Sequence, residues 1–399
     1  MKIRDVRTVV TCPGRNYVLL KIVTDSGIHG VGDGTLNGRE LAVAELLEQH
    51  LKPLLIGRDA DRIEDIWQDL FRGTYWRGGP VLNTALAAID MALWDIKGKR
   101  AQLPLYSLLG GKTRNAVLCY GHASGDSIPD TAQHAQQLID VGYRVVRCQT
   151  QIPGTQGTYG AGRGDAPRGE RLPFVETWEP TPYLNTIPKL FEFLRRELGD
   201  QIELLHDVHE RLNPIQAARL ACELEPFHLF FLEDPLRPEH KESFRVIRNH
   251  STIPLAMGEL FTNKWECLPL ITEQLIDFIR CDLAHVGGIT EARKIATLCE
   301  AFHIQTAWHG PPDVSPITHA ANVHLDLALP NFGVQEWSHH PEQVADVITG
   351  GPTFCDGYLT VSDLPGLGCD IDETAAARYP YERAYLPTTR RADGSVHDW

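Results

Sequence analysis

The sequence contains no long hydrophobic run, and no apolar stretch reaches the roughly 18 residues that a membrane-spanning helix needs. The opening segment MKIRDVRTVV also lacks the apolar core of a signal peptide, so we expect a cytoplasmic protein without a membrane partner. Positive charge is scarce: the chain has 38 Lys and Arg residues but 52 Asp and Glu residues, so its formal net charge is −14. That balance argues against nucleic acid as a partner. It does not exclude a small anionic substrate, provided that the binding site supplies positive charge.

Paired cysteine motifs are also missing. The nine cysteines show no CxxC spacing, and Cys119, Cys148 and Cys281 lie within apolar, strand-like runs. An odd number of cysteines in such contexts indicates reduced, structural thiols rather than a disulfide framework.

The chain is long enough, at 399 residues, for a (β/α)8 barrel of about 250 residues and a second domain. The first hundred residues do not follow a barrel pattern. KIRDVRTVVT and YVLLKIVTDSGIHGVG indicate antiparallel strands, and helical patterns follow at 40–55, 62–71 and 82–99. We therefore predict an α+β capping domain over residues 1–114.

From residue 115 the pattern alternates between strand, loop and helix. Eight apolar runs recur, namely AVLCYGHA, YRVVRCQT, IELLHDVHE, HLFFLEDP, PLAMGEL, FIRCDLAHVGG, IQTAWHG and FGVQEWS. Regular alternation of this kind predicts a modified, TIM-type (β/α)8 barrel over residues 115–345, with its active site at the carboxyl ends of the strands. For residues 346–399, a frayed terminus and a segment packed back on the cap and active site both fit the sequence, and we predict the second.

Three acidic residues in this barrel recur at equal intervals. Asp207, Glu233 and Glu259 each follow an apolar run, and 26 residues separate each from the next, which fits one βαβ unit. Successive parallel strands would bring the three carboxylates together at one edge. They would repel each other unless a divalent cation lay between them, and oxygen ligands favour Mg2+. Separate surface salt bridges are the alternative, but the regular spacing favours a magnesium enzyme.

Polar residues lie at the ends of all eight predicted strands. A structural protein has no use for ionisable groups gathered at one end of its strands, so the pattern indicates an active site. The residues concerned are His122, Arg147, Gln149, Asp207, His209, Glu233, Glu259, Arg280, Asp282, His309 and Glu336.

The connection after the second barrel strand is unusually long, because the next helix is expected to start near Ile187. Long loops in compact domains are usually functional or disordered. This one contains Tyr159, Phe174 and Trp178, which favours an ordered active-site loop over disorder.

These features resemble the enolase superfamily, which combines an α+β cap with a modified barrel carrying Asp, Glu and Glu on strands three, four and five. The closer resemblance, over essentially the whole chain, is to the D-mannonate dehydratase family. Most superfamily members carry a Lys-x-Lys pair on strand two, whereas this chain has Arg147, Cys148 and Gln149, as expected of that family. LPLYSLLGG at 103–111 is similar to the segment that leads from cap to barrel across the superfamily. The motifs shared with the D-mannonate dehydratase family are NG at 37–38, YGHASG at 120–125, RCQ at 147–149, TYG at 158–160, DVHERL at 207–212, WHGPPDVSP at 308–316 and the final tryptophan.

The resemblance implies Mg2+-dependent dehydration of D-mannonate to 2-keto-3-deoxy-D-gluconate. A proton leaves the carbon next to the carboxylate, and the 3-hydroxyl leaves as water. Tyr159 is the implied base, because a neighbouring Arg147 guanidinium would lower its pKa from the usual value of about 10. His209, two residues after Asp207, is the predicted acid for the leaving hydroxyl, and a metal-ligand role is its alternative.

The remaining polar residues are expected to bind the substrate. Arg280 offers a guanidinium that matches a carboxylate, and the resemblance implies that His309 binds substrate rather than acting as a base. Asn37 and Asp313 also have ordinary structural alternatives. Asn-Gly at 37–38 is a common turn, and Asp313, which follows a strand, could cap a helix. Whether Trp76 and Trp399 line the pocket is left open. The substrate contacts implied by resemblance are Asn37, His122, His309, Asp313 and Glu336.

Two alternatives to a D-mannonate dehydratase remain. Pro311, just after His309 and Gly310, is compatible with a broader enzyme that acts on D-gluconate or another aldonate. A sugar-acid-binding regulatory protein without turnover is the second, although the complete ligand set argues against it. By resemblance, we also expect a homo-oligomer.

Overall fold

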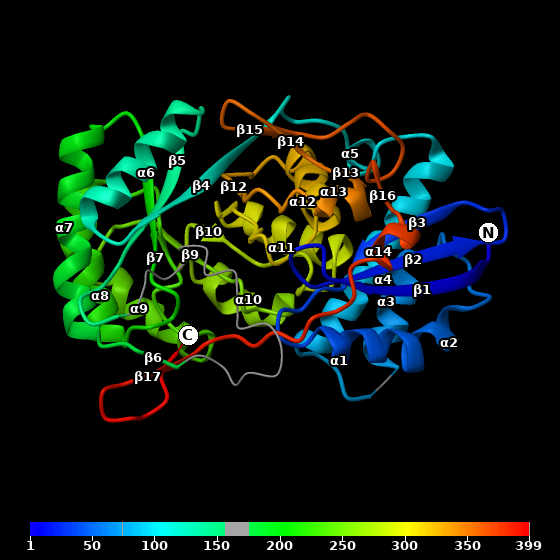
Figure 1. The fold of residues 1–399 in the computed structure, drawn as a ribbon, viewed down its shortest axis with the longest axis horizontal. Helices are drawn as coiled ribbons and strands as arrows, with labels where there is room; N and C mark the ends of the chain where they lie inside the picture. The colour runs from blue at the N-terminus through cyan, green and yellow to red at the C-terminus, as the bar shows by residue number, and fades with distance from the viewer. Residues whose placement is uncertain (74, 156–174, 399) are drawn as a thin grey trace.

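The computed structural model describes residues 1–73, 75–155 and 175–398 (Figure 1). The N-terminal residues form an antiparallel sheet of β1 (Ile3–Thr11), β2 (Tyr17–Thr24) and β3 (His29–Asp33). The predicted helix at 40–55 consists of α1 (Glu40–Glu45), a π-helical turn η1 (Leu46–Leu51) and α2 (Lys52–Leu55). It is followed by α3 (Ile63–Arg72) and α4 (Pro80–Ala101). These elements form a cap beside the barrel, at the right of Figure 1.

The cap sheet packs directly on α4. Gly30 and Gly32 of β3 face the backbone of this helix, and a Cβ at either position would lie about 2 Å from the carbonyl oxygens of Ala92 and Ala88. Only glycine allows this close approach. The predicted apolar stripe of α4 is buried in the cap core at Leu86, Ile89, Leu93 and Ile96.

Helix α4 also joins the cap to the barrel through a buried carboxylate. Asp90 Oδ2 accepts a 2.9 Å hydrogen bond from the backbone N–H of Thr290, in the first turn of barrel helix α11 (Ile289–Ala301). Burial raises the pKa of Asp90 to about 7, although the contacts with Thr290 act in the opposite direction.

This raised pKa predicts a pH-dependent stability. Between about pH 4 and pH 7 the folded protein holds a proton on Asp90 that the unfolded chain releases, so the free energy of unfolding falls as pH rises through this interval. Asp90→Asn keeps an oxygen for Thr290 and removes the titration. Its free energy of unfolding should rise relative to the original chain by up to about 1.4 kcal/mol per pH unit. Urea unfolding from pH 4.5 to 7.5 tests this, and parallel curves would contradict it.

The barrel consists, within the described residues, of eight parallel strands: β4 (Val117–Gly125), β5 (Val145–Thr150), β7 (Glu203–Asp207), β8 (Leu232–Glu233), β9 (Leu255–Met257), β10 (Phe278–Ile279), β11 (Gln305–Thr306) and β12 (Gln335–Glu336). Neighbours pair in this order, and β12 pairs with β4. A bridge between Thr306 and Phe332 connects β11 to the segment before β12 and closes the ring. The predicted barrel with an α+β cap is therefore confirmed.

One apolar side chain from each strand segment fills the barrel interior. Such a layer is typical of a closed parallel barrel, in which side chains from all strands meet on the axis. The layer consists of Tyr120, Val145, Leu205, Phe231, Ala256, Phe278, Ala307 and Val334.

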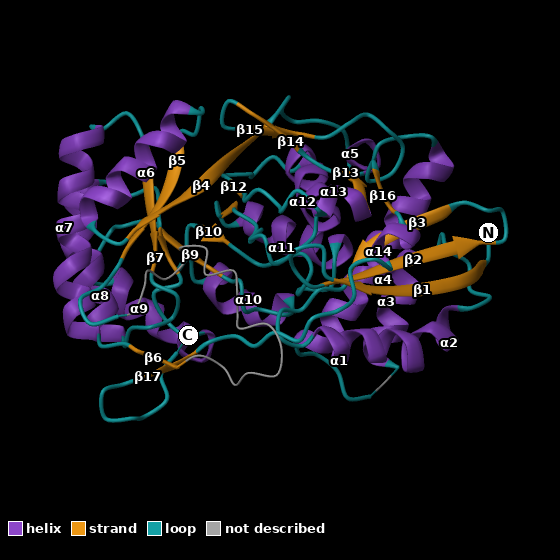
Figure 2. Ribbon diagram, viewed as in Figure 1, coloured by secondary structure: helices purple, strands orange, loops and turns teal. Residues whose placement is uncertain are grey.

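Helices surround this barrel (Figure 2). The principal ones are α6 (Ile128–Asp140), α7 (Pro180–Leu198), α8 (Pro214–Leu224), α9 (Phe244–Arg248), α10 (Lys264–Thr272), α11 and α12 (Pro316–Ala328). Shorter turns are α5 (Leu105–Leu108), η2 (Glu225–Phe227) and η3 (Pro238–Ser243). The expected start of α7 near Ile187 was wrong. The helix begins at Pro180, because Glu179 is extended and a proline is well suited to the first helical position.

The C-terminal residues return to both the cap and the barrel. Strand β14 (Thr353–Cys355) forms a hairpin with β15 (Tyr358–Thr360), which extends the sheet at β4. α13 (Val344–Val347) precedes β13 (Ile348–Gly350), which pairs with β16 (Cys369–Ile371) before α14 (Glu373–Ala376). Finally, β17 (Thr388–Arg390) pairs with β6 (Val175–Thr177) in the long connection before α7. The boundaries 1–114, 115–345 and 346–399 stay a prediction.

Candidate active site

A polar layer lies directly above the apolar layer of the barrel. Side chains two positions apart on a strand share a face, and in seven of the eight segments the residue two positions after the apolar one is charged or a histidine. These are His122, Arg147, Asp207, Glu233, Arg280, His309 and Glu336. The eighth position is Gly258, and Glu259 follows it. The structure therefore brings the predicted strand-end residues together around one axis.

Of the three predicted metal ligands, Glu233 and Glu259 belong to clusters of possible ligand atoms, whereas Asp207 lies outside these clusters. Asp207 and Glu233 are register partners on β7 and β8. Glu233, Asp234 and Glu259 offer oxygens that all lie within 4.8 Å of one another, as do the ligand atoms of His209, Glu210 and Glu259. Asp207 belongs to neither group. Its Oδ2 lies 2.9 Å from Arg147 Nη1, and its Oδ1 accepts a 2.8 Å hydrogen bond from the His209 backbone N–H.

The buried carboxylates fit a hard divalent cation. Glu233, Asp234 and Glu210 are all buried. Asp234 Oδ2 and Glu210 Oε1 have no hydrogen-bond partner among the described residues. Burial and the neighbouring carboxylates hold the pKa of both Asp234 and Glu210 well above its usual range. A dense set of carboxylate oxygens, some of which have no partner among the described residues, suits the oxygen coordination that Mg2+ prefers.

Arg280 is the central cation of the polar layer. Its Nη2 lies 2.6 Å from Glu233 Oε1 and 2.9 Å from Glu336 Oε2, and the side chain is fully buried. Burial opposes its charge, but Glu233 and the other nearby groups raise its pKa well above the usual value. Arg280 therefore stays charged and supports two acidic residues, and its predicted contact with a substrate carboxylate stays a prediction.

Two histidines of the layer have opposite protonation tendencies. His309 Nδ1 lies 2.8 Å from Asp282 Oδ2, and its Nε2 lies 3.5 Å from Glu259 Oε2. Burial lowers the pKa of His309, but Glu259, Glu336 and Asp282 outweigh burial and raise it to about 9. His122 Nε2 lies 2.9 Å from Glu336 Oε1, and burial and Arg147 lower the pKa of this histidine. In this arrangement His309 is suited to donating a hydrogen bond to an anion or a hydroxyl.

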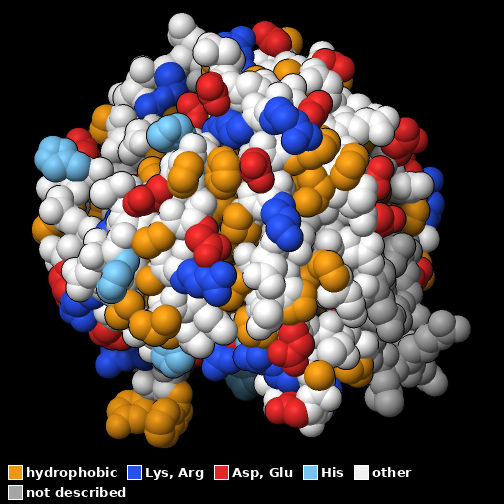
Figure 3. Space-filling model, turned by 90° about the vertical axis from the view of Figure 1, so that its left-hand side faces the viewer, with side chains coloured by type: hydrophobic (Ala, Val, Ile, Leu, Met, Phe, Trp, Pro, Cys, Tyr) orange, Lys and Arg blue, Asp and Glu red, His pale blue; other side chains and the backbone are white. Residues whose placement is uncertain are grey.

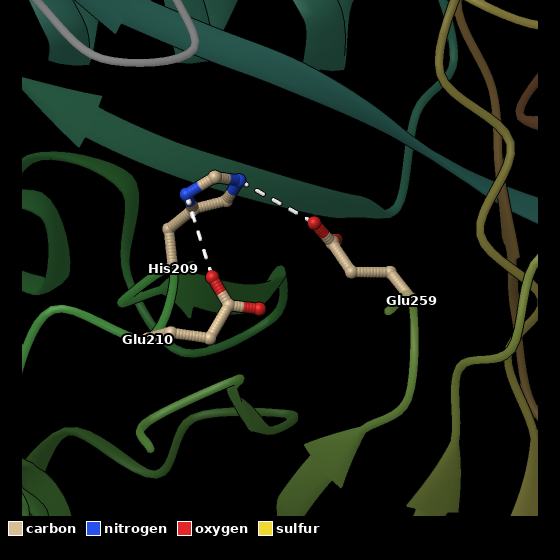
Figure 4. A group of neighbouring side chains, drawn as sticks. All are labelled: His209, Glu210 and Glu259. Atoms are coloured by element: carbon tan, nitrogen blue, oxygen red, sulfur yellow. Dashed lines mark ion pairs between the residues drawn. The ribbon is translucent and has the colours of Figure 1, made fainter. Parts of the chain in front are cut away.

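His209 lies between two carboxylates (Figure 4). Its Nε2 is 3.3 Å from Glu259 Oε1, and its Nδ1 is 3.6 Å from Glu210 Oε2. This arrangement places a potential proton donor beside the candidate metal ligand Glu259. It also retains the alternative of a metal-ligand role, because His209 belongs to one of the two ligand groups.

The cap contributes residues to the same end of the barrel. Asn37 Nδ2 donates a 2.8 Å hydrogen bond to Asp313 Oδ2, and Arg15 forms an ion pair with Asp313. The structure thus brings two predicted substrate-binding residues together across the interface between cap and barrel. Trp76 is 84% exposed, whereas Tyr159 and Trp399 lie outside the described residues, so the Arg147–Tyr159 pair stays a prediction.

Sequence reasoning missed Glu210 and Asp234, although each directly follows a residue that it selected. Strict alternation along a strand would turn them away from the site. The backbone departs from alternation here, because His209, Glu210 and Asp234 have φ values of 57°, 57° and 38°. The motifs DVHE and LEDP contain the acidic residues, but only the left-handed backbone after each strand brings them inward.

Comparison with known proteins matches nearly the whole chain. Residues 4–110 match the N-terminal domain model of the mandelate racemase/muconate lactonizing enzyme family, and residues 130–375 match the model described as enolase C-terminal domain-like. A D-mannonate dehydratase of Caulobacter sp. (strain K31) is 52% identical over 403 residues, with 100% of both chains covered. A D-galactonate dehydratase family member of Chromohalobacter salexigens shows the same identity over 403 residues and the same coverage.

A solved structure has the same architecture. The crystal structure of an enolase from Pantoea ananatis, with D-gluconate and Mg bound, has a TM-score of 0.93 and 43% sequence identity. The alignment covers 100% of this chain and 100% of the chain in that structure.

Proposed function

Because the chain belongs to the mandelate racemase/muconate lactonizing enzyme family of the enolase superfamily, we propose that it is a Mg2+-dependent sugar-acid dehydratase that converts D-mannonate to 2-keto-3-deoxy-D-gluconate. The observation that carries the proposal is the polar layer, in which the acidic side chains Asp207, Glu233 and Glu336, two arginines and two histidines lie above the barrel interior. The similarity to proteins named D-mannonate dehydratase supports this substrate.

Glu233 and Glu259 are proposed to hold the metal ion together with Asp207. Asp234 supports them, because it belongs to the same cluster and its Oδ2 has no hydrogen-bond partner among the described residues. When bound, Mg2+ supplies a Lewis acid to the substrate carboxylate, which favours loss of the neighbouring proton. Arg147 orients Asp207 through their 2.9 Å contact.

The proton transfers are assigned to side chains of the chain itself. Tyr159 is proposed to remove the proton next to the carboxylate, assisted by the positive charge of Arg147. His209 is proposed to give a proton to the leaving 3-hydroxyl, because it lies beside Glu259 at the carboxyl end of the barrel. His309, whose pKa is raised to about 9, is proposed to hold a substrate oxygen. His122, Asn37, Asp313 and Glu336 are proposed to contact the sugar hydroxyls.

A broader aldonate dehydratase is the second candidate. A relative at 52% identity is named a D-galactonate dehydratase family member, and the Pantoea ananatis structure contains D-gluconate. Pro311 adjoins His309 and Gly310 and is placed to influence this choice. A non-catalytic sugar-acid-binding protein is the third candidate.

An aldonate panel separates these candidates. Purified protein with Mg2+ is incubated with D-mannonate, D-gluconate and D-galactonate, and 2-keto-3-deoxy acid is measured. We expect product from D-mannonate, and none once EDTA removes the metal. Product from D-gluconate alone would favour the second candidate, and binding without product from any aldonate would favour the third.

Surface and assembly features add little to the choice of substrate. On the face shown in Figure 3, acidic and basic side chains are interspersed with scattered hydrophobic ones. No helix in the described part of the chain could cross a bilayer. A cytoplasmic location and a homo-oligomer stay predictions.

A further inference from the structure

The loop that follows β11 carries His309, Pro311 and Asp313, and its backbone is held tightly at Gly310. The Gly310 N–H donates a 2.9 Å hydrogen bond to Glu336 Oε2, and the Gly310 carbonyl lies 2.8 Å from His319 Nε2. Both peptide groups next to His309 and Pro311 are therefore fixed, one by strand β12 and the other by helix α12.

His319 is the first member of a row of hydrogen-bonded side chains that ends in the cap. His319 Nδ1 lies 2.9 Å from His340 Nε2, and His340 Nδ1 lies 3.2 Å from the Tyr17 hydroxyl on β2. Tyr17 and His319 are almost completely inaccessible to solvent. These hydrogen bonds therefore connect the cap sheet to the peptide bond beside His309 through two buried side chains and the half-buried His340.

The direction of the hydrogen bonds follows from their last acceptor. A carbonyl oxygen can only accept, so His319 Nε2 must carry a hydrogen. In a neutral ring His319 Nδ1 then accepts from His340 Nε2–H, and His340 Nδ1 accepts from the Tyr17 hydroxyl. Burial lowers the pKa of both histidines, which favours neutral rings. One arrangement of hydrogens thus satisfies every ring nitrogen in the chain.

The cap touches the same loop at further points. The Tyr17 hydroxyl also lies 3.4 Å from the Pro312 carbonyl oxygen, and Arg15 forms an ion pair with Asp313. Asp33 accepts hydrogen bonds of 2.7 Å from the Ser315 N–H and 2.8 Å from the Thr318 hydroxyl, just beyond the loop. The loop is consequently held by the cap and the barrel at Gly310, Pro312, Asp313 and Ser315.

We propose that Tyr17, His340 and His319 are positioning residues for the aldonate reaction: their hydrogen-bond chain sets the backbone after His309 and so places His309 and Asp313 against the substrate. The inference rests on the proposed function, because it needs those two residues to contact the sugar acid. Displacement of a positioned group by about 1 Å costs up to about 100-fold in rate. Loss of these hydrogen bonds should therefore lower kcat/KM without changing the metal site.

The first test removes only the hydroxyl at the cap end. Tyr17→Phe should lower kcat/KM for D-mannonate about tenfold, while Mg2+ affinity, measured by calorimetry, stays unchanged. Tyr106→Phe is the matched control, because the Tyr106 hydroxyl donates to Asp363, away from the loop. It should retain the original kcat/KM. Equal kcat/KM in Tyr17→Phe and the original chain would overturn the proposal.

The second test uses conservative rescue at the barrel end. His319→Gln can keep a donor for the Gly310 carbonyl and an acceptor for His340, whereas His319→Leu fills similar space with neither. Glutamine should retain at least several-fold more kcat/KM than leucine. Equal losses in two variants with cooperative unfolding would show that the hydrogen bonds do not position the loop.

A third measurement does not depend on turnover. In 15N NMR of histidine-labelled protein, His319 and His340 should both appear as neutral, Nε2-protonated rings, and Tyr17→Phe should change the His340 signal. The opposite tautomer at His319 would overturn the proposal.

If the original chain produces no keto acid from any aldonate, the proposed function fails. Aldonate affinity in calorimetry then tests positioning, and unchanged affinity in Tyr17→Phe would overturn it.

Discussion

Tyr159→Phe should abolish dehydration of D-mannonate while leaving Mg2+ binding intact. General acid–base catalysis contributes roughly 10²–10⁴-fold to rates, and phenylalanine keeps the ring but removes the group that would accept the proton. We expect kcat to fall by about that factor. Initial rates of keto-acid formation and Mg2+ titration by calorimetry provide the two measurements.

A matched control for this substitution exists elsewhere in the chain. Tyr358 lies beside an arginine, as is proposed for Tyr159, with the Arg144 guanidinium 5.4 Å from its ring centre, but it belongs to the β14–β15 hairpin. Tyr358→Phe should leave kcat unchanged. Full activity in Tyr159→Phe would remove Tyr159 as the base and would direct attention to His309, one of the other titratable groups predicted to contact the substrate.

Glu233→Gln should weaken Mg2+ binding and activity together. Glu233 is a fully buried member of the acidic cluster with Asp234 and Glu259, and it pairs with Arg280. Glutamine preserves the shape and removes the charge. Loss of outer-shell partners alone typically costs about 10–100-fold in metal affinity, so removal of a charged ligand should weaken Mg2+ by about 100-fold or more. Calorimetric titration and kcat/KM measure the two effects.

The control for charge removal is Glu300→Gln on the exposed side of α11. It should change neither Mg2+ affinity nor kcat/KM. Unchanged Mg2+ affinity in Glu233→Gln would place the ion elsewhere, and the group formed by His209, Glu210 and Glu259 would then be the next candidate. Circular dichroism of both variants checks that the fold is retained.

Much of the active site could be predicted from the sequence because it follows strand periodicity. Asp207 and Glu233 each lie two positions after an apolar residue of the barrel interior, and the same holds for Arg147 and Arg280. A side chain at this spacing must share the face of its apolar neighbour. The roles of these residues, by contrast, came from family resemblance and stay proposals.

Contacts that depend on irregular backbone or on the cap could not be predicted. Glu210 and Asp234 enter the site through left-handed backbone at positions occupied by residues other than glycine. Asp313 meets Asn37 and Arg15, which are nearly 300 positions away in the chain. Spacing carries no information about such pairs, because they depend on how the cap packs against the barrel.

The sequence by itself determined the barrel, the cap and the ring of polar strand ends, since local alternation of apolar and polar residues already specifies which face each side chain takes. Only the tertiary structure decided which carboxylates share a cluster, which of them pair with Arg147 or Arg280, and how Tyr17 reaches the loop beside His309. Those outcomes depend on distances of a few ångströms between distant segments. Burial makes these distances matter, because a charge or donor removed from water must find its partner inside the protein.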